Sequence, residues 1–440
     1  MCGLAGYFGA ASVAPGERTA RLRAMAGLLA HRGPDGEGFA EGQGFGLGHR
    51  RLAIIDLETG QQPMVSGDGK SVIAFNGEIY NYLELRPGLE ARGIDFRTKS
   101  DTEVLLEQLK ARGPEGLREL NGMFALACVD RASGSWMLAR DPFGIKPLYY
   151  AQAEGVLVFA SEIKALLAWP DLARGVDPQA LEDYLTFQFS LGEATLFKGI
   201  RKLEPGTYAQ GRGGQIQSVH RYADPSFRVD DHHTPDYFVE KLRALLEDAT
   251  RLQVRSDVPV GAYLSGGMDS SGVAVLASRH LGRSVKFFHG LFREGPAYDE
   301  SAFARAVARQ AGGELLTVSP GPKDFVQDLP RLIESMDEPV AGPGLFPQYE
   351  VSLLASRHGK VVLGGQGGDE IFGGYARYLI GYLEQALKGA IFETQEEGSH
   401  IVSLSSMIPH LPLLRTYGPL MQRFWSDGLF QDMDARYFRL

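Results

Sequence analysis

Cys2 is the first residue whose type and position could do chemistry. The chain opens MCGLAGYFG, and a small residue in second place allows the initiator methionine to be removed. Cys2 would then carry its thiol beside a free α-amine, which pairs a nucleophile with a general base. An isolated cysteine is more often a small buried apolar residue, so the rest of the sequence has to decide between the two interpretations.

A glycine-rich turn, LSGGMDSS from Leu264 to Ser271, has the composition of a phosphate-binding loop. Its glycines let the backbone approach an anion, its serines add hydroxyl donors, and the helix expected after it supplies unpaired N–H groups. The sequence has no GxxxxGK[ST] motif, which excludes a Walker A loop. A bare SGG turn is also an ordinary strand-to-helix connection, so this turn alone does not establish a site.

A second glycine-rich turn, LGGQGGDEIFGGY, places Asp369 and Glu370 after another apolar run. Asp269 lies inside the first turn, where a carboxylate facing phosphate needs a cation such as Mg²⁺ between them. Turns at the carboxyl ends of parallel strands meet at one edge of the sheet. Together the two turns predict a site for the pyrophosphate part of ATP with Mg²⁺.

The N-terminal half combines strand-length apolar runs with helical patterns. Helices are expected over 17–33 and 100–113, and Ser100 and Glu103 have the spacing of a capping box. Strands are expected over 71–82, 122–130, 135–144 and 155–162. This mixture predicts a layered α+β domain.

The pattern changes after a linker candidate at 222–237, which is rich in Asp, His and Pro and has no apolar period. The run VPVGAYLSGGMDSSGVAVLASRHLG then reads as strand, turn and helix. GELLTVS and KVVLGGQGGDE are further candidates for buried strands, with helical segments between them. Alternating strands and helices predict a parallel, doubly wound sheet.

Composition excludes several classes of protein. The 440 residues, 44% of them hydrophobic, are enough for two or three domains with sizeable cores. Cys2 and Cys128 cannot form a disulfide framework, and no run resembles a signal peptide or a membrane span, so we expect a cytoplasmic protein. The formal net charge of −9 gives no electrostatic reason to bind nucleic acid.

The turn SGGMDSS resembles the PP-loop of ATP pyrophosphatases, and GGQGGDEIFGGYARY resembles the second signature of asparagine synthetases. The N-terminal half resembles that family's glutaminase domain, with these motifs in the family's order and spacing: MCGLAGYFG, HRGPDGEG, GHRRLAIIDL, FNGEIYNY, SDTEVLL, GMFALA and RDPFGIKPLYY. The resemblance runs from Cys2 to about Tyr378. It implies a four-layer αββα N-terminal-nucleophile (Ntn-hydrolase) glutaminase domain over 2–222. It also implies a doubly wound, parallel-sheet PP-loop ATP pyrophosphatase domain over 236–440, truncated relative to the family.

The resemblance assigns a role to each residue of the glutamine site. Cys2 would attack the side-chain amide of glutamine, with its own α-amine as base, and release ammonia. Asn76 and the N–H of Gly77 would form the oxyanion hole. The remaining glutamine-binding residues would be Arg51 on the α-carboxylate, Glu78 and Asp101 on the α-ammonium, and Leu52, Ile54 and Ile55 around them.

The same resemblance implies that ATP activates a carboxylate as an acyl-adenylate, which ammonia then attacks. The adenosine part would be held largely by the main chain at Tyr263, Leu264, His289, Gly364 and Gly365. The phosphates would lie on Ser265, Gly266, Gly267, Asp269, Ser270 and Ser271. Asp269 and Asp369 would hold Mg²⁺.

Two departures from the family put the second half in doubt. Gln366 stands where the family commonly has a glutamate, and an amide cannot take a proton. Family members also continue past ARYFRL with a VPFLD-like segment and a lysine. The favoured substrates are glutamine, ATP and aspartate, with a homodimer possible. The alternatives are an amidotransferase with a different acceptor carboxylate, a sugar or phosphoribosyl amidotransferase, which the PP-loop disfavours, or a non-catalytic nucleotide-binding partner of a full-length homologue.

Overall fold

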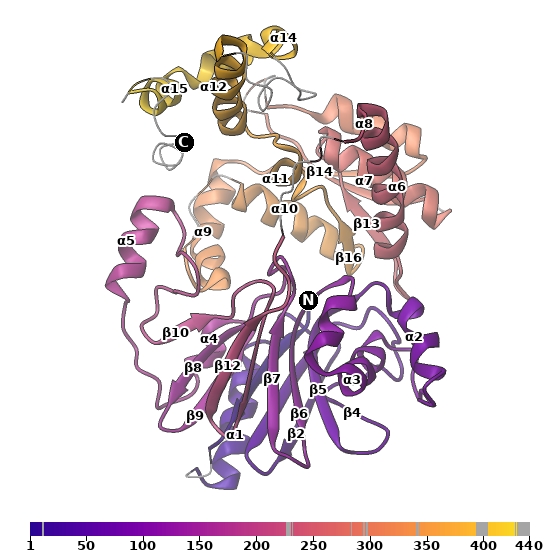
Figure 1. Ribbon diagram of the computed structural model, residues 1–440, viewed down its shortest axis with the longest axis vertical. Coiled ribbons are helices and arrows are strands. Elements are labelled where there is room, and N and C mark those ends of the chain that lie inside the picture. Colours follow the sequence, from indigo (N-terminus) through magenta and orange to yellow (C-terminus); the bar gives the residue numbers. More distant parts are fainter. Residues whose placement is uncertain are drawn as a thin grey trace.

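The computed structural model describes residues 1–10, 13–225, 230, 232–282, 284–293, 295, 298–339, 342, 344–392, 404–426 and 428. Figure 1 shows the N-terminal half as stacked sheets with helices outside them, and the C-terminal half as a helix-rich part above them. The N-terminus lies where the two parts meet (Figure 1). Cys2 is therefore close to both halves of the chain.

Among the described residues, the N-terminal half forms two antiparallel six-stranded sheets. The first has the order β10-β8-β9-β1-β3-β2. Its strands are β1 Gly3–Phe8, β2 Gly36–Gly42, β3 Phe45–Arg51, β8 Tyr149–Ala153, β9 Val156–Ala160 and β10 Ile200–Lys202. The second has the order β12-β11-β7-β6-β5-β4. Its strands are β4 Met64–Val65, β5 Ser71–Ile79, β6 Gly122–Asp130, β7 Ser135–Arg140, β11 Thr207–Arg212 and β12 Gln215–Arg221.

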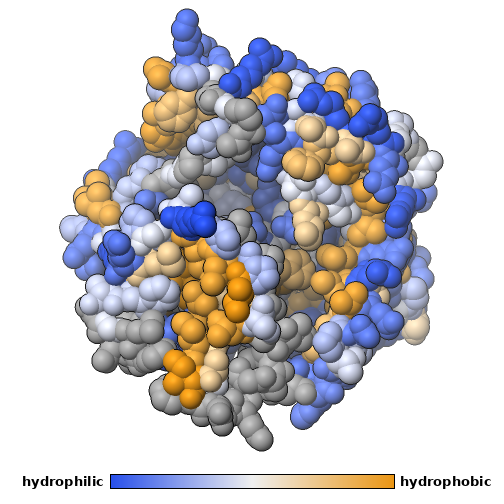
Figure 2. Space-filling view, turned by 90° about the horizontal axis from the view of Figure 1, so that it is seen from above, coloured by the Kyte–Doolittle hydropathy of each residue, from blue (hydrophilic) through white to orange (hydrophobic). Residues whose placement is uncertain are grey.

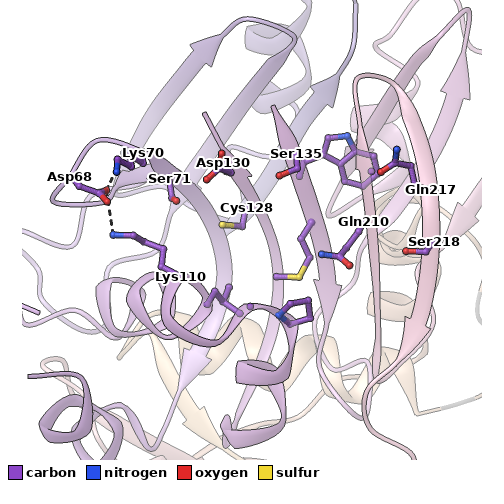
Figure 3. A pocket seen from close by; sticks show the side chains of 16 residues that line it. Asp68, Lys70, Ser71, Lys110, Cys128, Asp130, Ser135, Gln210, Gln217 and Ser218 are labelled. Atoms are coloured by element: carbon purple, nitrogen blue, oxygen red, sulfur yellow. Dashed lines mark hydrogen bonds and ion pairs between the residues drawn. The ribbon is translucent and has the colours of Figure 1, made fainter. Parts of the chain in front are cut away.

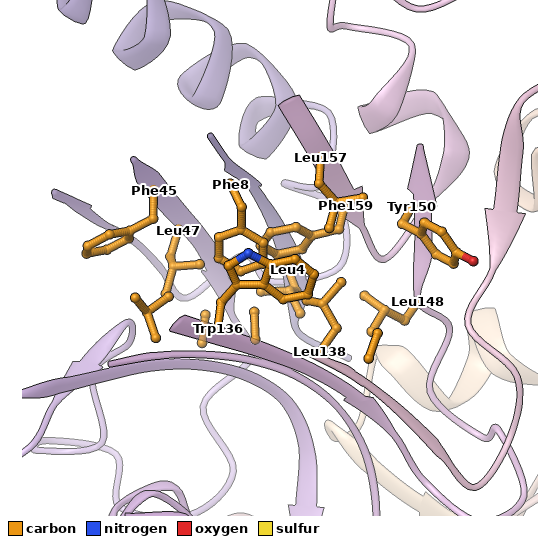
Figure 4. Packing of buried hydrophobic residues seen from close by; sticks show 14 of the residues in the cluster. Leu4, Phe8, Phe45, Leu47, Trp136, Leu138, Leu148, Tyr150, Leu157 and Phe159 are labelled. Atoms are coloured by element: carbon orange, nitrogen blue, oxygen red, sulfur yellow. The ribbon is translucent and has the colours of Figure 1, made fainter. Parts of the chain in front are cut away.

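The main core lies between these sheets, where inward-facing side chains of both meet (Figure 4). Phe8 of β1 stacks on Trp136 of β7 with ring centroids 4.5 Å apart, and Leu4 and Leu138 are fully buried in the same cluster. Each such side chain contributes about 1.5–3 kcal/mol on burial. Because Leu4 and Phe8 anchor β1 in this core, Cys2 at its start is held in a fixed place.

Helices cover the outer face of each sheet and complete the four-layer αββα order expected from the resemblance. Leu22 and Met25 of α1 (Pro15–Gly27) and Ile163 of α4 (Ile163–Leu166) pack on the first sheet. Leu105 and Leu106 of α3 (Asp101–Arg112) pack on the second. Helix α2 (Tyr82–Glu90) also lies on this side, although the sequence predicted a strand over 71–82. That strand ends at Ile79.

The capping box predicted at the start of α3 is only half formed. The Ser100 hydroxyl accepts the N–H of Thr102, as an N-cap should. The Glu103 carboxylate instead accepts the N–H groups of Arg97 and Thr98. Glu103 therefore fixes the approach to the helix rather than its first turn, and this part of the prediction is wrong.

The C-terminal half contains a parallel four-stranded sheet with the order β15-β14-β13-β16 among the described residues. The strands are β13 Val260–Tyr263, β14 Lys286–Gly290, β15 Glu314–Val318 and β16 Val361–Leu363. The chain moves outward from β13 to β15 and then returns to the other side of β13. The strand order therefore reverses between β13 and β16, which is where open α/β sheets bind ligands.

The remaining helical elements belong to both halves of the chain, with α5 and the first 3-10 turn in the N-terminal half and the others in the C-terminal half. They are α5 Pro178–Phe187, α6 Pro235–Gln253, α7 Met268–Leu281, α8 Ser301–Ala311, α9 Pro322–Met336, α10 Leu345–Ser356, α11 Gly368–Phe372, α12 Ala376–Phe392, α14 Leu404–Met407 and α15 Gly418–Phe424, with 3-10 turns at Gly113–Glu119 and Ile408–Tyr417. Figure 2, seen from above, shows apolar side chains in patches around a hollow on this face. No helix within the described residues has the length and apolar character to cross a membrane.

Candidate active site

A cavity of about 490 Å³ lies at the junction of the two parts and contains Cys2. Its lower wall comes from the N-terminal half, with Leu52, Ile54, Asn76, Gly77 and Glu78. Its upper wall comes from β13 and β16, through Tyr263 and the stretch from Lys360 to Gly364. Cys2 and these five residues are six of the predicted glutamine-site residues, and the structure brings them together. The C-terminal half forms the other wall of the same cavity.

The Cys2 thiol is held by the neighbouring loop. The Leu52 N–H donates to Cys2 Sγ at 3.4 Å, and the Cys2 carbonyl oxygen accepts from Arg32 Nε at 2.9 Å. Burial raises the pKa of the Cys2 thiol, so the nucleophile needs a base at neutral pH. Burial lowers the pKa of the N-terminal amine of Met1 to about 6. This amine belongs to Met1; removal of Met1 would expose the α-amine of Cys2 one residue further along, beside the thiol.

Asn76 has an amide group with no hydrogen-bond partner among the described residues. Its side chain is completely buried on β5, and both Nδ2 and Oδ1 are unpaired. An unpaired buried amide costs about 1–3 kcal/mol, so a partner in the cavity would recover this energy. A donor beside the nucleophilic sulfur is the group that stabilises a developing oxyanion.

Gly77 follows Asn76 on β5, and its neighbours leave no room for a side chain. A Cβ here would overlap the carbonyl oxygen of Met123 and lie 2.8 Å from Phe124 Cα. Glycine is therefore required for β5 to pair with β6. Its presence in the cavity wall has a packing reason in addition to the predicted catalytic one.

Two carboxyl groups lie next to each other behind the same wall. Burial raises the pKa of Asp101 to about 6, although the Ile79 N–H donates to its carboxylate at 2.9 Å. Burial and the nearby Asp101 raise the pKa of Glu78 well above its ordinary value. Both shifts show that a negative charge is costly here. A bound cation, such as the α-ammonium of an amino acid, would offset this cost.

Arg51 does not reach the cavity in this structure. Its guanidinium donates to the carbonyl oxygens of Ile55 at 3.2 Å, Asp56 at 2.5 Å and Leu57 at 3.2 Å. Arg51, Ile55 and Asp101 are not among the residues that line the cavity. In this structure the Arg51 guanidinium holds the loop that contacts the Cys2 thiol. Its predicted contact with a substrate carboxylate stays a prediction.

A second cavity, of about 560 Å³, lies at the carboxyl end of the parallel sheet. The predicted residues that line it are Tyr263, Leu264, Ser265, Gly267, Asp269, Ser270, His289, Gly365 and Asp369. Gly266, with φ +101°, makes the turn that only glycine adopts readily. Gly266, Ser271 and Gly364 lie outside the lining of this cavity, and Gly364 lines the Cys2 cavity instead.

The two glycine-rich turns meet, as the sequence predicted. A Cβ on Gly365 would lie 2.7 Å from the Ser270 nitrogen, and one on Gly368 would lie 2.6 Å from Asp269 Cγ. The turn after β16 therefore packs directly on the start of α7. This contact brings Asp269 and Asp369 to one cavity.

The donor set of this cavity fits Mg²⁺ only in company with phosphate. No group of three or more Cys, His, Asp or Glu side chains able to hold a metal occurs in the described part of the chain. Mg²⁺ is usually bound by one or two carboxylates together with substrate phosphates. Asp269 and Asp369 supply those two carboxylates, so the residues present fit a magnesium–nucleotide complex.

His289 does more than pack. Its Nδ1–H donates to the Leu264 carbonyl oxygen at 2.8 Å, which fixes the start of the phosphate turn. Its Nε2 is buried without a partner among the described residues. The sequence interpretation allowed the ring a packing role only; the hydrogen bond depends on β13 and β14 being adjacent.

Tyr263 and Gln366 line both cavities and form the wall between them. Gln366 Nε2 donates to Gln348 Oε1 at 3.0 Å, and the Tyr263 and Ser352 hydroxyls are 2.8 Å apart. A small molecule leaving the Cys2 cavity toward the second one must pass these side chains. The Cys2 cavity and the cavity of the glycine-rich turns therefore adjoin, with Tyr263 and Gln366 between them.

Comparison with known families agrees with this arrangement. The model of the glutamine amidotransferase domain matches residues 1–223, and the asparagine synthase model matches residues 241–423. This chain belongs to the glutamine-hydrolysing asparagine synthetase family. The chain is 38% identical over 380 residues to asparagine synthetase [glutamine-hydrolyzing] 1 of Bacillus subtilis, covering 86% of this chain and 59% of that protein.

Two further relatives in the family have a similar sequence identity to this chain and are also matched over only part of their length. A putative asparagine synthetase of Mycobacterium tuberculosis is 39% identical over 400 residues, covering 86% of this chain and 61% of that protein. A putative asparagine synthetase of Methanocaldococcus jannaschii is 33% identical over 384 residues, with 82% and 73% covered. The chain spans about six tenths of the length of the first two relatives.

Lys146 is a residue of the Cys2 cavity that the sequence analysis did not single out. It is buried, it lines the Cys2 cavity, and burial lowers the pKa of its ammonium group while Glu78 and Cys2 oppose that shift. The motif RDPFGIKPLYY contained it. A lysine inside a shared motif was the available signal, but only the fold shows that this side chain reaches the thiol.

A third hollow, of about 510 Å³, lies beside α3 on the outer face of the second sheet and holds none of the predicted site residues (Figure 3). Lys110 forms an ion pair of 3.3 Å with Asp68 at one side of it. Cys128 lines its floor, and burial raises the pKa of that thiol to about 12. Cys128 is therefore the less reactive of the two cysteines.

Proposed function

We propose that this chain is a glutamine-dependent, ATP-consuming ligase that converts aspartate to asparagine. The observation that carries the proposal is the shared wall of the two cavities, formed by Tyr263 and Gln366. The first cavity is lined by the Cys2 thiol, the unpaired Asn76 amide and the Glu78 carboxyl group. The second is lined by the glycine-rich turn and the carboxylates of Asp269 and Asp369. Membership of the asparagine synthetase family supports aspartate as the acceptor.

In the first cavity, Cys2 Sγ attacks the side-chain carbonyl carbon of glutamine, and the α-amine takes the thiol proton. Asn76 Nδ2 and the Gly77 N–H hold the oxyanion, and collapse of the intermediate breaks the carbon–nitrogen bond. The departing nitrogen takes the proton from the amine and leaves as ammonia. Water then hydrolyses the γ-glutamyl thioester to glutamate and restores the thiol.

In the second cavity, a carboxylate oxygen of aspartate attacks the α-phosphorus of ATP and displaces pyrophosphate. Ser265, Ser270 and the N–H groups at the start of α7 hold the phosphates. Mg²⁺, held by Asp269 and Asp369, would supply the positive charge that offsets the charge of the pyrophosphate. Ammonia then attacks the acyl carbon, and AMP leaves with the bond to its phosphate oxygen broken. Cytoplasmic location and a homodimer, both expected from the sequence, stay predictions.

The test is the identity of the products. The purified chain is supplied with amide-¹⁵N glutamine, aspartate, ATP and Mg²⁺, and the products are identified by mass spectrometry. We expect ¹⁵N-asparagine, glutamate, AMP and pyrophosphate in equal amounts. Release of glutamate without AMP, or AMP formation only with another carboxylic acid, would overturn the assignment.

A further inference from the structure

The loop from Leu52 to Leu57 is hydrogen-bonded, directly or through Asp35, to residues that precede β13 and the edge strand β16 of the parallel sheet. The Asp257 carboxylate, just before β13, accepts the Asp56 N–H at 2.7 Å, and the Asp257 N–H donates to the Ile54 carbonyl oxygen at 3.0 Å. Asp257 therefore both accepts a hydrogen bond from the 52–57 loop and donates one to it. They fix the position of the loop relative to β13.

Lys360, just before β16, makes a second contact with this loop, through Asp35. Its Nζ lies 2.7 Å from Asp35 Oδ2, and the same carboxylate oxygen accepts the Ala53 N–H at 2.8 Å. Asp35 therefore joins Lys360 to the middle of the loop. A loop of the N-terminal half is held by the two strands that flank the switch point in the C-terminal half.

The far ends of these strands carry the phosphate site. β13 leads directly into the turn with Asp269, and β16 leads into the turn with Asp369. At the near ends, the tied loop contacts the nucleophile, because the Leu52 N–H donates to Cys2 Sγ. β13 and β16 therefore connect the two glycine-rich turns to the residues that hold the loop beside Cys2.

Arg255 adds a contact on the opposite wall of the Cys2 cavity. Its guanidinium donates to the Tyr80 carbonyl oxygen at 2.6 Å and pairs with the Glu84 carboxylate at 2.5 Å. Arg255 and Tyr80 both line the Cys2 cavity. The stretch 255–257 therefore holds the 52–57 loop and the end of β5 at once.

We propose that Asp257 and Lys360 are positioning residues that couple the two sites, so that binding of ATP changes the setting of the 52–57 loop against Cys2. The coupling rests on the proposed function. It makes glutamine hydrolysis respond to the occupancy of the phosphate site, so that less ammonia is released while that site is empty. Because coupling free energies are reciprocal, glutamine changes the affinity for ATP by the same factor.

The test measures alkylation of Cys2 by iodoacetamide, with and without ATP and Mg²⁺, by mass spectrometry, with glutathione in the same sample as the reference thiol. In the wild type we expect ATP to change the alkylation rate at least threefold. In Asp257→Ala we expect about tenfold faster alkylation without ATP and no response to ATP. Asp248→Ala removes an exposed carboxylate of the same region, whose partner is Arg251, and should behave as the wild type.

Lys360→Ala is the second variant, because its ion pair is partly exposed and its loss leaves the core intact. It should reduce the ATP response at least twofold. Asp257→Asn, which keeps an acceptor oxygen, should restore most of it. An ATP response in Asp257→Ala and Lys360→Ala equal to that of the wild type, or none in the wild type, overturns the coupling. The product assay is separate, so labelled asparagine from a chain without this response would reject the coupling alone.

Discussion

Cys2 is the residue on which the first half of the reaction depends. Its thiol is held by the Leu52 N–H inside a cavity that also contains an unpaired amide and a buried lysine. The raised pKa of the thiol means that the sulfur is reactive only when a base removes its proton. We therefore expect a base to remove the proton of the Cys2 thiol during the reaction, and we do not expect a thiolate in the resting protein.

We predict that Cys2→Ala lowers glutamine hydrolysis by at least about a thousandfold, because no other group in the cavity can form the thioester. ATP–pyrophosphate exchange supported by aspartate should be unchanged, since it uses the other cavity. Glutamate release and exchange are measured on the same preparation. Substantial hydrolysis in Cys2→Ala would remove the thiol from the mechanism.

The low pKa of the terminal amine predicts the pH dependence. Burial lowers the pKa of the Met1 amine to about 6. We expect the same burial to lower the pKa of the Cys2 amine that removal of Met1 exposes, and this amine acts as a base only above its pKa. We expect kcat for glutamine hydrolysis to rise as the pH passes 6 and to level off above 7. Asp101, also with a pKa near 6, should affect kcat/KM by binding the substrate's ammonium group. A rise in kcat centred near pH 8, the ordinary value for an α-amine, would contradict this assignment.

Arg51→Ala should raise the KM for glutamine far more than it lowers kcat. The loss of charge-assisted hydrogen bonds costs about 2–4 kcal/mol, and in this structure those bonds hold the 55–57 loop beside the thiol. Michaelis curves for the variant and the wild type provide the check. An unchanged KM would show that neither the loop nor the substrate depends on the guanidinium.

At the scale of elements, the phosphate site depends on the contact between the turn after β16 and the start of α7. The close approach of Gly365 to the Ser270 nitrogen leaves no room for a methyl group. Short-range crowding of this kind costs about 1–3 kcal/mol when the neighbours cannot move. The contact is therefore a sensitive place to probe the convergence of the two turns.

We predict that Gly365→Ala lowers ATP–pyrophosphate exchange by about ten- to a hundredfold and leaves glutamine hydrolysis without ATP within twofold of the wild type. Gly359→Ala is the matched control, because a Cβ there would meet only the Pro259 carbonyl oxygen at 3.5 Å. Equal exchange rates in the two variants would mean that the two turns do not form one nucleotide site.

Asp269→Asn and Asp369→Asn test the metal carboxylates at the same scale. Each change removes one negative charge and keeps the side chain's size, so the turns should retain their packing. We expect each to reduce exchange at least about a hundredfold and to raise the Mg²⁺ concentration needed for half-maximal rate. Titration of exchange against Mg²⁺ is the measurement. An unaltered Mg²⁺ requirement in both variants would argue against the assigned ligands.

At the scale of the whole molecule, the sequence predicted the layers and both sites' motifs because these follow local patterns. Apolar runs of strand length predicted the strands of the N-terminal half. Glycine-rich turns after apolar runs predicted the ligand-binding edge of the parallel sheet. Helix α2 was missed because Pro87 lies inside it, which argues against a helix. Lys146, Asp257 and Lys360 were missed because their roles depend on which loops the tertiary fold brings together.

The inter-part contacts are likewise invisible to motif reasoning. Asp337, at the end of α9, accepts the Ile163 N–H at 2.6 Å and pairs with Lys164, and Glu338 accepts the Leu196 N–H. These residues are far apart in the sequence. Their pairing joins α9 and the residue after it to the N-terminal half.

The central claim is that ammonia released at Cys2 passes to the second cavity inside the protein. The direct test supplies amide-¹⁵N glutamine together with a tenfold excess of unlabelled ammonium, and measures the ¹⁵N content of the asparagine formed. Because Tyr263 and Gln366 separate two adjoining cavities, we predict that most of the product carries ¹⁵N. Asparagine labelled only to the extent of the ammonium in solution would contradict the account.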